Sequence, residues 1–184
     1  MMEMVRVELG SRSYEILIEP GLMERIGSVT ADRIPERRLF LITNPVVGDL
    51  YLEQVRQSLE SAGFDVTHLL VPDGEPAKNL HTVENIYTYL IAQKADRRST
   101  LAALGGGVTG DIVGFVAATF LRGVPYIQIP TTLLAQVDSS VGGKTGVNHS
   151  LGKNLIGAFY QPRLVCVDPN TLRTLSEREY RAGL

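Results

Sequence analysis

Two glycine-rich stretches carry the residues whose types and spacing best suit chemistry. The first, Gly105–Asp111, reads Gly-Gly-Gly-Val-Thr-Gly-Asp and lies between an apolar run and a helix-like run. The second, Asp138–Gly146, is polar and contains Lys144, and Lys153 and Asn154 follow it closely. Glycines let a backbone approach a phosphate, and the N–H groups at a helix N-terminus carry partial positive charge toward it. The two stretches therefore predict a phosphate cradle beside a cationic loop, in one cleft that binds a dinucleotide and an anionic substrate.

The first stretch satisfies the pattern G-x-G-x-x-G at Gly105, Gly107 and Gly110. The common dinucleotide fingerprint lies in the first strand-to-helix turn of a domain and has an acid near the end of the next strand. Here the motif comes late in the chain, and the next strand ends in Pro130–Thr132, which contains no acid. We therefore expect a different dinucleotide-binding α/β fold. The alternative is a glycine turn that only packs a helix on a strand.

Asp111 follows these glycines, and we expect it in the first turn of the helix that they open. An acid there is favourable for the helix dipole but unfavourable beside a phosphate. Two interpretations remain open at this point. Asp111 accepts a hydrogen bond from a sugar hydroxyl, or it is a simple charge at a helix end.

The second stretch is similar to a nucleotide triphosphatase loop at Gly143–Thr145. That motif requires a glycine at position 138, which is Asp, and no strand runs directly into it, so we exclude this function. Lysines in a glycine-rich loop suit a phosphate or carboxylate, and Asp138 can orient a hydroxyl or hold a lysine. The alternative is a solvated loop with scattered charges. The predicted substrate-facing residues are Asp138, Lys144, Lys153, Asn154 and Arg122.

The remaining residues that could bind a metal or react are few. His68, His81 and His149 are scattered without the spacing of metal ligands, so no metal site is assigned to this chain. Cys166 is the one cysteine, and its apolar neighbours in Leu164–Val167 predict a buried strand thiol.

Composition excludes several classes of function. The chain has 184 residues, of which 44% are hydrophobic and 21% are charged, which fits one globular domain. With a net charge of -2 and no basic stripe, we expect no nucleic-acid partner. The apolar runs are too short to span a membrane, and the N-terminus is unlike a signal peptide. We expect a cytoplasmic protein.

The elements that must position these residues alternate along the chain. Val5–Leu9 and Tyr14–Ile18 have the period of strands and predict an N-terminal β-hairpin. Asn44 and Pro45 predict the start of a long helix that ends at Gly63. Residues 139–162 show little periodicity and are expected to form a functional or mobile loop. Further strands are expected at Leu39–Ile42, Val66–Val71, Leu101–Leu104, Tyr126–Ile129 and Leu164–Val167, with helices at Leu22–Val29, Leu80–Lys94 and Thr109–Leu121. The fold class is α/β, a Rossmann-like and mainly parallel sheet flanked by helices.

Several segments together resemble the 3-dehydroquinate synthase family of the shikimate pathway, and their spacing matches as well. The resemblance implies that residues 1–184 are one NAD-binding α/β domain and that residues from about 176 begin a helical C-terminal domain. The matching segments are Asp73–Lys78, Gly105–Asp111, Arg122–Pro125, Pro130–Thr132, Asp138–Lys144 and Leu151–Gly157.

The resemblance also implies an activity. Family members convert a phosphorylated seven-carbon keto acid (DAHP) to 3-dehydroquinate and phosphate, and NAD oxidises one carbinol and is regenerated in each turnover. They form homodimers and hold Zn²⁺ or Co²⁺ in the C-terminal domain, so we expect this chain to be inactive alone. Another sugar-phosphate cyclase, a related polyol dehydrogenase, and an NAD-binding module without catalysis remain alternatives.

Carried over by motif, the resemblance implies roles for single residues. Asn44 would touch the adenosine portion of NAD, and Glu75 would contact a ribose. Thr131 and Thr132 would line the nicotinamide side. Arg122 would reach the site of a neighbouring subunit. The full set implied for the cofactor is Asn44, Asp73, Gly74, Glu75, Pro76, Ala77, Lys78, Gly106, Gly107, Val108, Thr109, Gly110, Asp111, Thr131, Thr132, Lys144, Lys153, Thr171, Leu172, Arg173 and Thr174.

Overall fold

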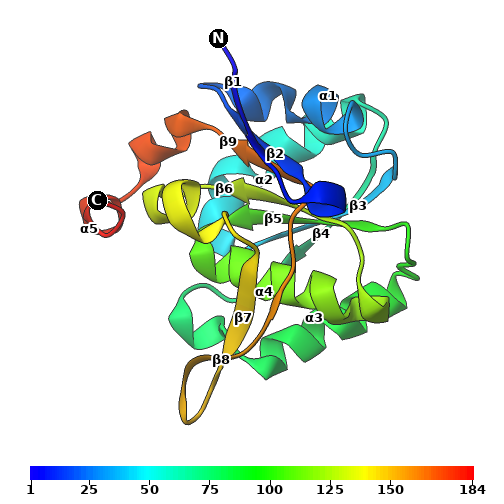
Figure 1. The fold of residues 1–184 in the computed structure, drawn as a ribbon, viewed down its shortest axis with the longest axis vertical. Coiled ribbons are helices and arrows are strands. Elements are labelled where there is room, and N and C mark those ends of the chain that lie inside the picture. Colours follow the sequence, from blue (N-terminus) through cyan, green and yellow to red (C-terminus); the bar gives the residue numbers. More distant parts are fainter.

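A computed structural model describes residues 1–184 as a seven-stranded sheet between layers of helices (Figure 1). The strand order is β1-β2-β9-β6-β5-β3-β4, and every neighbouring pair is parallel except β1 and β2, which form the expected hairpin. The strands are β1 (Glu3–Val7), β2 (Tyr14–Ile18), β3 (Arg38–Thr43), β4 (Asp65–Leu70), β5 (Thr100–Gly105), β6 (Tyr126–Pro130) and β9 (Leu164–Val167). The predicted fold class is confirmed.

Helices cover both faces of the sheet because the central strands are apolar on both sides. In β3, Leu39 and Leu41 belong to the core beneath α1 and α2, whereas Phe40 and Ile42 belong to the core beneath α3 and α4. None of the helices is both long and apolar enough to cross a membrane. The helices are α1 (Ile26–Ala31), α2 (Pro45–Ser61), α3 (Leu80–Ala92), α4 (Gly107–Thr119) and α5 (Glu177–Arg181).

Helix α2 shows how local sequence sets these boundaries. The Asn44 side chain accepts a hydrogen bond from the Val47 N–H at 2.8 Å, and Pro45 is the first helical residue. Gly63 follows the end of the helix with a φ of 88°, a left-handed conformation that favours glycine. The start and end predicted for this helix are confirmed.

Strand β9 runs between β2 and β6 and is completely buried. Cys166 is buried there as predicted, and burial raises the pKa of its thiol to about 12. The thiol is therefore a packing group in the core beneath α1 and α2.

Helix α4 is deeply buried, as its small and apolar residues predict. A Cβ at Gly110 would lie 2.7 Å from Oε1 of Gln128 in β6, and a Cβ at Gly114 would lie 2.5 Å from Cγ2 of Thr145. Glycines therefore let α4 approach the sheet on one side and a second layer of chain on the other.

That second layer corrects the loop predicted for residues 139–162. The segment forms two antiparallel strands, β7 (Lys144–His149) and β8 (Gly152–Phe159), which lie across α4 (Figure 1). Val147 is fully buried against α4, and Gly146 pairs with Gly157 in the hairpin. These strands consist largely of glycine and polar residues, so the hairpin depends on tertiary packing and gives little periodicity in the sequence.

Candidate functional site: two adjoining cavities

The larger part of the candidate site is a cleft of about 630 Å³ at the carboxyl ends of the parallel strands. Strands β3 and β5 are neighbours in the sheet. After β3 the chain continues to β4 at one edge of this pair, and after β5 it continues to β6 at the other edge, so the direction of strand addition reverses between β3 and β5. Open α/β sheets bind ligands in the crevice at such a switch point. The predicted cofactor residues that line this cleft are Asn44, Asp73, Gly74, Glu75, Lys78, Gly106, Gly107, Val108, Thr109, Asp111, Thr131, Thr132 and Thr174.

The other predicted cofactor residues lie outside the lining of the cleft. Gly110 faces Gln128 in the core, and Thr171 is buried, where its hydroxyl accepts a hydrogen bond from Nε2 of Gln136 at 2.9 Å. Pro76 and Ala77 belong to the short 3-10 turn Glu75–Ala77, which shapes the loop after β4. Also absent from the lining are Leu172, Arg173, Lys144 and Lys153.

The N-terminus of α4 opens into this cleft. Gly106 is the N-cap residue, and no side chain caps the helix, so the first-turn N–H groups have no acceptor within it. A Cβ at Gly106 would lie 3.0 Å from Cγ2 of Thr132, and one at Gly107 would lie 2.9 Å from Oγ of Ser139. The backbone therefore lines the cleft directly and presents donors that suit an anion.

An ion pair between the buried Lys78 and the partly buried Asp111 lies where the two cavities meet. Lys78 is 5% exposed, and its Nζ contacts the Asp111 carboxylate and donates to Oδ1 of Asn154 at 2.5 Å. Burial raises the pKa of Asp111, and the hydrogen bond from Lys78 opposes this rise. The placement of Asp111 in the first turn was wrong, because α4 begins at Gly107 and Asp111 falls in the second turn. A simple helix-end charge is also excluded, since the carboxylate pairs with a buried cation.

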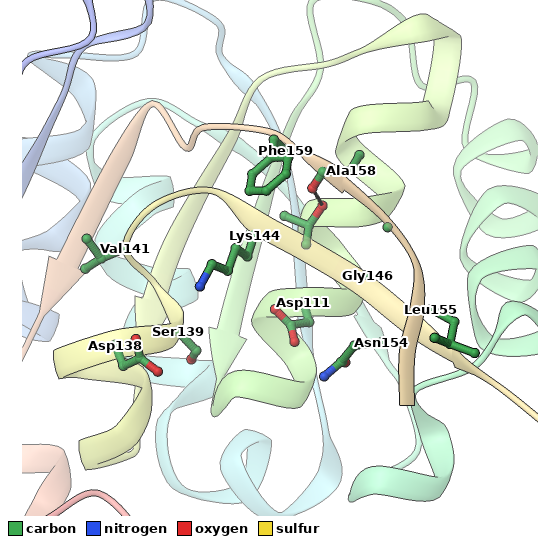
Figure 2. A pocket seen from close by; sticks show the side chains of 12 residues that line it. Asp111, Asp138, Ser139, Val141, Lys144, Gly146, Asn154, Leu155, Ala158 and Phe159 are labelled. Atoms are coloured by element: carbon green, nitrogen blue, oxygen red, sulfur yellow. Dashed lines mark hydrogen bonds between the residues drawn. The ribbon is translucent and has the colours of Figure 1, made fainter. Parts of the chain in front are cut away.

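The second cavity is a pocket of about 540 Å³ between α4, the turn at Ala135–Ser139 and the hairpin. Figure 2 shows the amine of Lys144 directed into this pocket, with Asp138 and Ser139 on one side and Asp111 and Asn154 on the other. The structure thus brings together three of the predicted substrate residues, Asp138, Lys144 and Asn154. Asp111 and Ser139 line both cavities, so the two are adjacent.

Two predicted substrate residues lie outside this pocket. The side chain of Lys153 is 75% exposed, and its Nζ lies 3.7 Å from Oε1 of Glu75 at the margin of the cleft. Arg122 is exposed in the 3-10 turn Phe120–Arg122, at the opposite end of α4 from Asp111. Within one chain, the structure does not bring Arg122 to either cavity.

The apolar wall of the cleft was not predicted from the sequence. Val46 and Leu50 line it from α2 and are 58% and 49% exposed. They are four residues apart, so they share one helix face, opposite the buried Val55 and Leu59. An exposed apolar pair on the polar face of a helix was the signal that could have identified them.

No group of three or more His, Cys, Asp or Glu side chains in residues 1–184 has the arrangement of a metal site. His149 is the last residue of β7, and its Nδ1 accepts a hydrogen bond from the Leu151 N–H at 3.2 Å. His68 belongs to β4 and His81 to α3.

The fold and the cleft define the chain as a doubly wound α/β domain with a nucleotide-type site at its switch point. A family model described as "3-dehydroquinate synthase N-terminal" matches residues 68–182, and the chain belongs to this family. It is 57% identical over 183 residues to 3-dehydroquinate synthase of Geotalea uraniireducens and 56% identical to that of Pelobacter propionicus. Each alignment covers 100% of this chain and 51% of the relative, so the chain spans about half the length of these curated relatives.

Solved structures of related cyclases share the fold over nearly the whole chain. A 2-deoxy-scyllo-inosose synthase complexed with carbaglucose-6-phosphate, NAD⁺ and Co²⁺ has a TM-score of 0.89 and 31% identity, over 98% of this chain and 49% of its own. A 2-epi-5-epi-valiolone synthase from Streptomyces hygroscopicus with NAD⁺ and Zn²⁺ has a TM-score of 0.86 and 32% identity, over 96% and 49%. Glycerol dehydrogenase of Schizosaccharomyces pombe, at 17% identity and a TM-score of 0.72 over 89% and 39%, shares the fold alone.

Proposed function

We propose that this chain is the NAD-binding half of a 3-dehydroquinate synthase. The whole enzyme would convert a phosphorylated seven-carbon keto acid to 3-dehydroquinate and phosphate, and NAD would supply reversible oxidation at one substrate carbon. Family membership supports the reaction, and the two cyclase structures, both with NAD⁺ bound, support the cofactor.

One observation carries the proposal: the uncapped glycine N-terminus of α4 opens into the cleft between β3 and β5. Its N–H groups and the helix dipole suit a pyrophosphate, and Gly106 and Gly107 leave no Cβ between the backbone and the ligand. The cleft volume of about 630 Å³ lies within the range of cofactor sites, roughly 300–1,000 Å³. The residues present therefore fit NAD.

The two ends of the cleft suit the two ends of the cofactor. Val46 and Leu50 offer an apolar wall for the adenine ring. The carboxylates of Asp73 and Glu75 can accept hydrogen bonds from ribose hydroxyls, and Nδ2 of Asn44 holds Asp73 at 2.8 Å. The nicotinamide would then lie toward Thr131 and Thr132, nearest the second pocket, as the family resemblance implies.

The second pocket suits an anionic, hydroxylated substrate. Lys144 supplies a positive charge for a phosphate or carboxylate, and Asn154 supplies an amide. Asp138 forms no ion pair within 4 Å, so its carboxylate can accept a hydrogen bond from a substrate hydroxyl. Lys153 would add charge from the rim. We propose Arg122 as a contribution to the same pocket of a second copy in a homodimer.

A divalent metal does not fit residues 1–184, because they contain no group of suitable ligands. The related cyclases contain Co²⁺ or Zn²⁺, and we propose that the corresponding ligands lie outside this half. It follows that the chain alone binds NAD but does not turn over.

Titration calorimetry of NAD into the purified chain tests the cofactor, and release of phosphate from the keto acid, with added Zn²⁺, tests turnover. We expect binding without phosphate release. A chimera that continues after Leu184 with the remaining half of the Geotalea uraniireducens relative should restore release. Absence of binding at millimolar NAD would contradict the cofactor assignment, and sustained turnover by the chain alone would contradict its inactivity.

Other sugar-phosphate cyclases are the competing candidates, since their structures match at 31–32% identity. The 57% identity to a 3-dehydroquinate synthase favours the proposed substrate. The chimera can be tested with a panel of phosphorylated ketoses. Preference for a ketose other than the seven-carbon keto acid would replace the proposed substrate and leave the NAD site unchanged.

A further inference from the structure

We propose that Asn148 is a positioning residue that ties the NAD cleft to the substrate pocket. The inference rests on the proposed function, since it takes the cleft as the NAD site. Asn148 lies on β7, at the point where the pairing of β7 with β8 shifts register. It lines neither cavity, yet it bonds to residues of both.

Both the nitrogen and the oxygen of the Asn148 carboxamide form hydrogen bonds. Its Nδ2 donates to Oε1 of Glu75 at 2.8 Å, and its Oδ1 accepts from the Asn154 N–H at 2.8 Å. The Asn148 N–H also donates to the carbonyl oxygen of Lys78 at 2.8 Å, which fixes this part of β7 to the turn after β4. One side chain thus joins a cleft residue to a pocket residue.

Asn154 depends on this contact because its backbone is unusual. Val147 pairs with Ile156 while His149 pairs with Gly152, so β8 has extra residues opposite Asn148. Asn154 has a φ of 57°, a left-handed conformation that is uncommon outside glycine. Such bulges are frequent beside active sites, where they redirect a side chain. Figure 2 shows the side-chain amide of Asn154 at the pocket, and its Oδ1 also accepts a hydrogen bond from the buried amine of Lys78.

Glu75 depends on the contact because little else holds its carboxylate. The side chain is 43% exposed, and its other partner is the exposed amine of Lys153 at 3.7 Å, a pair of little energetic weight. The bond from Asn148 orients the carboxylate on the wall of the cleft, where it would meet a ribose hydroxyl. Movement of Glu75 upon binding would therefore be transmitted to the backbone of Asn154.

The chemistry of position 148 requires a donor and an acceptor in one planar group. Asparagine supplies both, aspartate supplies only acceptors, and alanine supplies neither. The variants Asn148→Ala and Asn148→Asp therefore separate the two contacts. Asn85→Ala, an exposed asparagine on α3 that lines neither cavity, is the matched control.

The contact between Asn148 and Asn154 is tested without ligand, by NMR hydrogen exchange of the Asn154 backbone N–H. We expect exchange at least about tenfold faster in Asn148→Ala, because a hydrogen bond is lost, and near wild-type exchange in Asn148→Asp and Asn85→Ala. Unchanged exchange in Asn148→Ala would overturn the inference. Exchange in Asn148→Asp as fast as in Asn148→Ala would also overturn it, because a general weakening of the hairpin would then explain both.

The cleft side is tested by calorimetric NAD affinity in a double-mutant cycle. Asn148→Ala should weaken binding by about three- to tenfold, because Glu75 loses its orienting bond. In the Glu75→Ala background the same change should weaken binding less than about twofold, since its target is gone. An unchanged Kd in Asn148→Ala, or the same loss in both backgrounds, would overturn the inference.

The two failures are distinguishable. If the wild-type chain binds no NAD, the proposed function is contradicted together with the cleft side of this inference, while the Asn154 exchange still decides the pocket side. If the wild type binds NAD and Asn148→Ala binds equally well, only the role of Asn148 is contradicted.

Discussion

The two cavities are built in different ways although they share Asp111 and Ser139. Much of the cleft is lined by residues that follow parallel strands of the main sheet, as Asn44, Gly106 and Thr131 follow β3, β5 and β6, so the main sheet holds it in place. The pocket is lined by a hairpin that lies on the outer side of α4 and pairs with no strand of the main sheet. The main sheet thus positions the cleft, whereas the packing of Val147 on α4, the Gly146–Gly157 pair and the bonds of Asn148 position the pocket.

The largest effect, a loss of NAD affinity, should come from introducing a side chain at the glycine N-terminus of α4. Gly107→Val would place a branched side chain within about 2.9 Å of Ser139 Oγ, where the pyrophosphate must approach the backbone. We expect calorimetry to show at least a hundredfold loss of NAD affinity, about 2.7 kcal/mol. Gly48→Val on α2 is the control, since its Cβ meets only the side chains of Leu70 and Thr43, at 3.3 and 3.4 Å, and Gly48 does not line the cleft. Equal losses in both variants would contradict a specific phosphate cradle.

A substitution in the β7–β8 hairpin should destabilise the pocket and leave NAD binding in the cleft largely unchanged. A Cβ at Gly157 would lie 2.4 Å from the carbonyl oxygen of Thr145, which is backbone and cannot move aside. Gly157→Val should cost about 1–3 kcal/mol in urea denaturation, as overpacked sites do. Gly152→Ala is the control, because its Cβ meets only the Leu155 side chain at 3.0 Å. NAD affinity should fall no more than about tenfold, the factor expected for loss of the Asn148 bond. Complete loss of NAD binding would show that the cleft is not independent of the hairpin.

The shared residue Asp111 should give a pH dependence of stability. Because burial raises its pKa, Asp111 binds its proton more tightly in the folded chain than in the unfolded chain. This contribution is complete below the ordinary carboxyl pKa of about 3.9 and is lost as the pH rises through the raised value. The free energy of unfolding of wild type minus that of Asp111→Asn should therefore fall as pH rises from about 4, by at most about 1.4 kcal/mol per pH unit. A difference that rises with pH would mean that the pair with Lys78 outweighs burial.

The smallest effect, on the free energy of unfolding, is expected for Lys153 at the rim of the cleft. Lys153 is 75% exposed and 3.7 Å from Glu75, so Lys153→Ala should change the free energy of unfolding by less than about 0.5 kcal/mol. Urea denaturation at low and high salt checks this, and no salt dependence should distinguish the variant from the wild type. A larger change would show that the rim, like the cleft, contributes to the fold.

The same contrast explains how much the sequence predicts. Asn44, Pro45 and Gly63 act through local rules, so the ends of α2 follow from the residues themselves. The run from Leu39 to Ile42 is apolar on both faces, which indicates a central strand, and Asn44, which follows β3, lies at the cleft.

The hairpin does not follow from local rules. Gly146 and Gly157 form strands only because α4 covers one side of them, and the left-handed Asn154 has no sequence signal. The role of Asn148 depends on contacts with Glu75 and Lys78, which lie far from it in the chain, as well as with the nearby Asn154, so only the structure reveals it.

In the proposed function, NAD binds at the ends of the strands and not beneath the hairpin. NMR chemical-shift mapping of the ¹⁵N-labelled chain during NAD titration tests it most directly. We predict the largest shifts at the amides of Gly106–Thr109 and Asp73–Lys78, with smaller shifts at Asn148 and Asn154 and little change at Leu155–Phe159. Shifts centred on Leu155–Phe159, or no shifts at millimolar NAD, would contradict the assignment of the cleft.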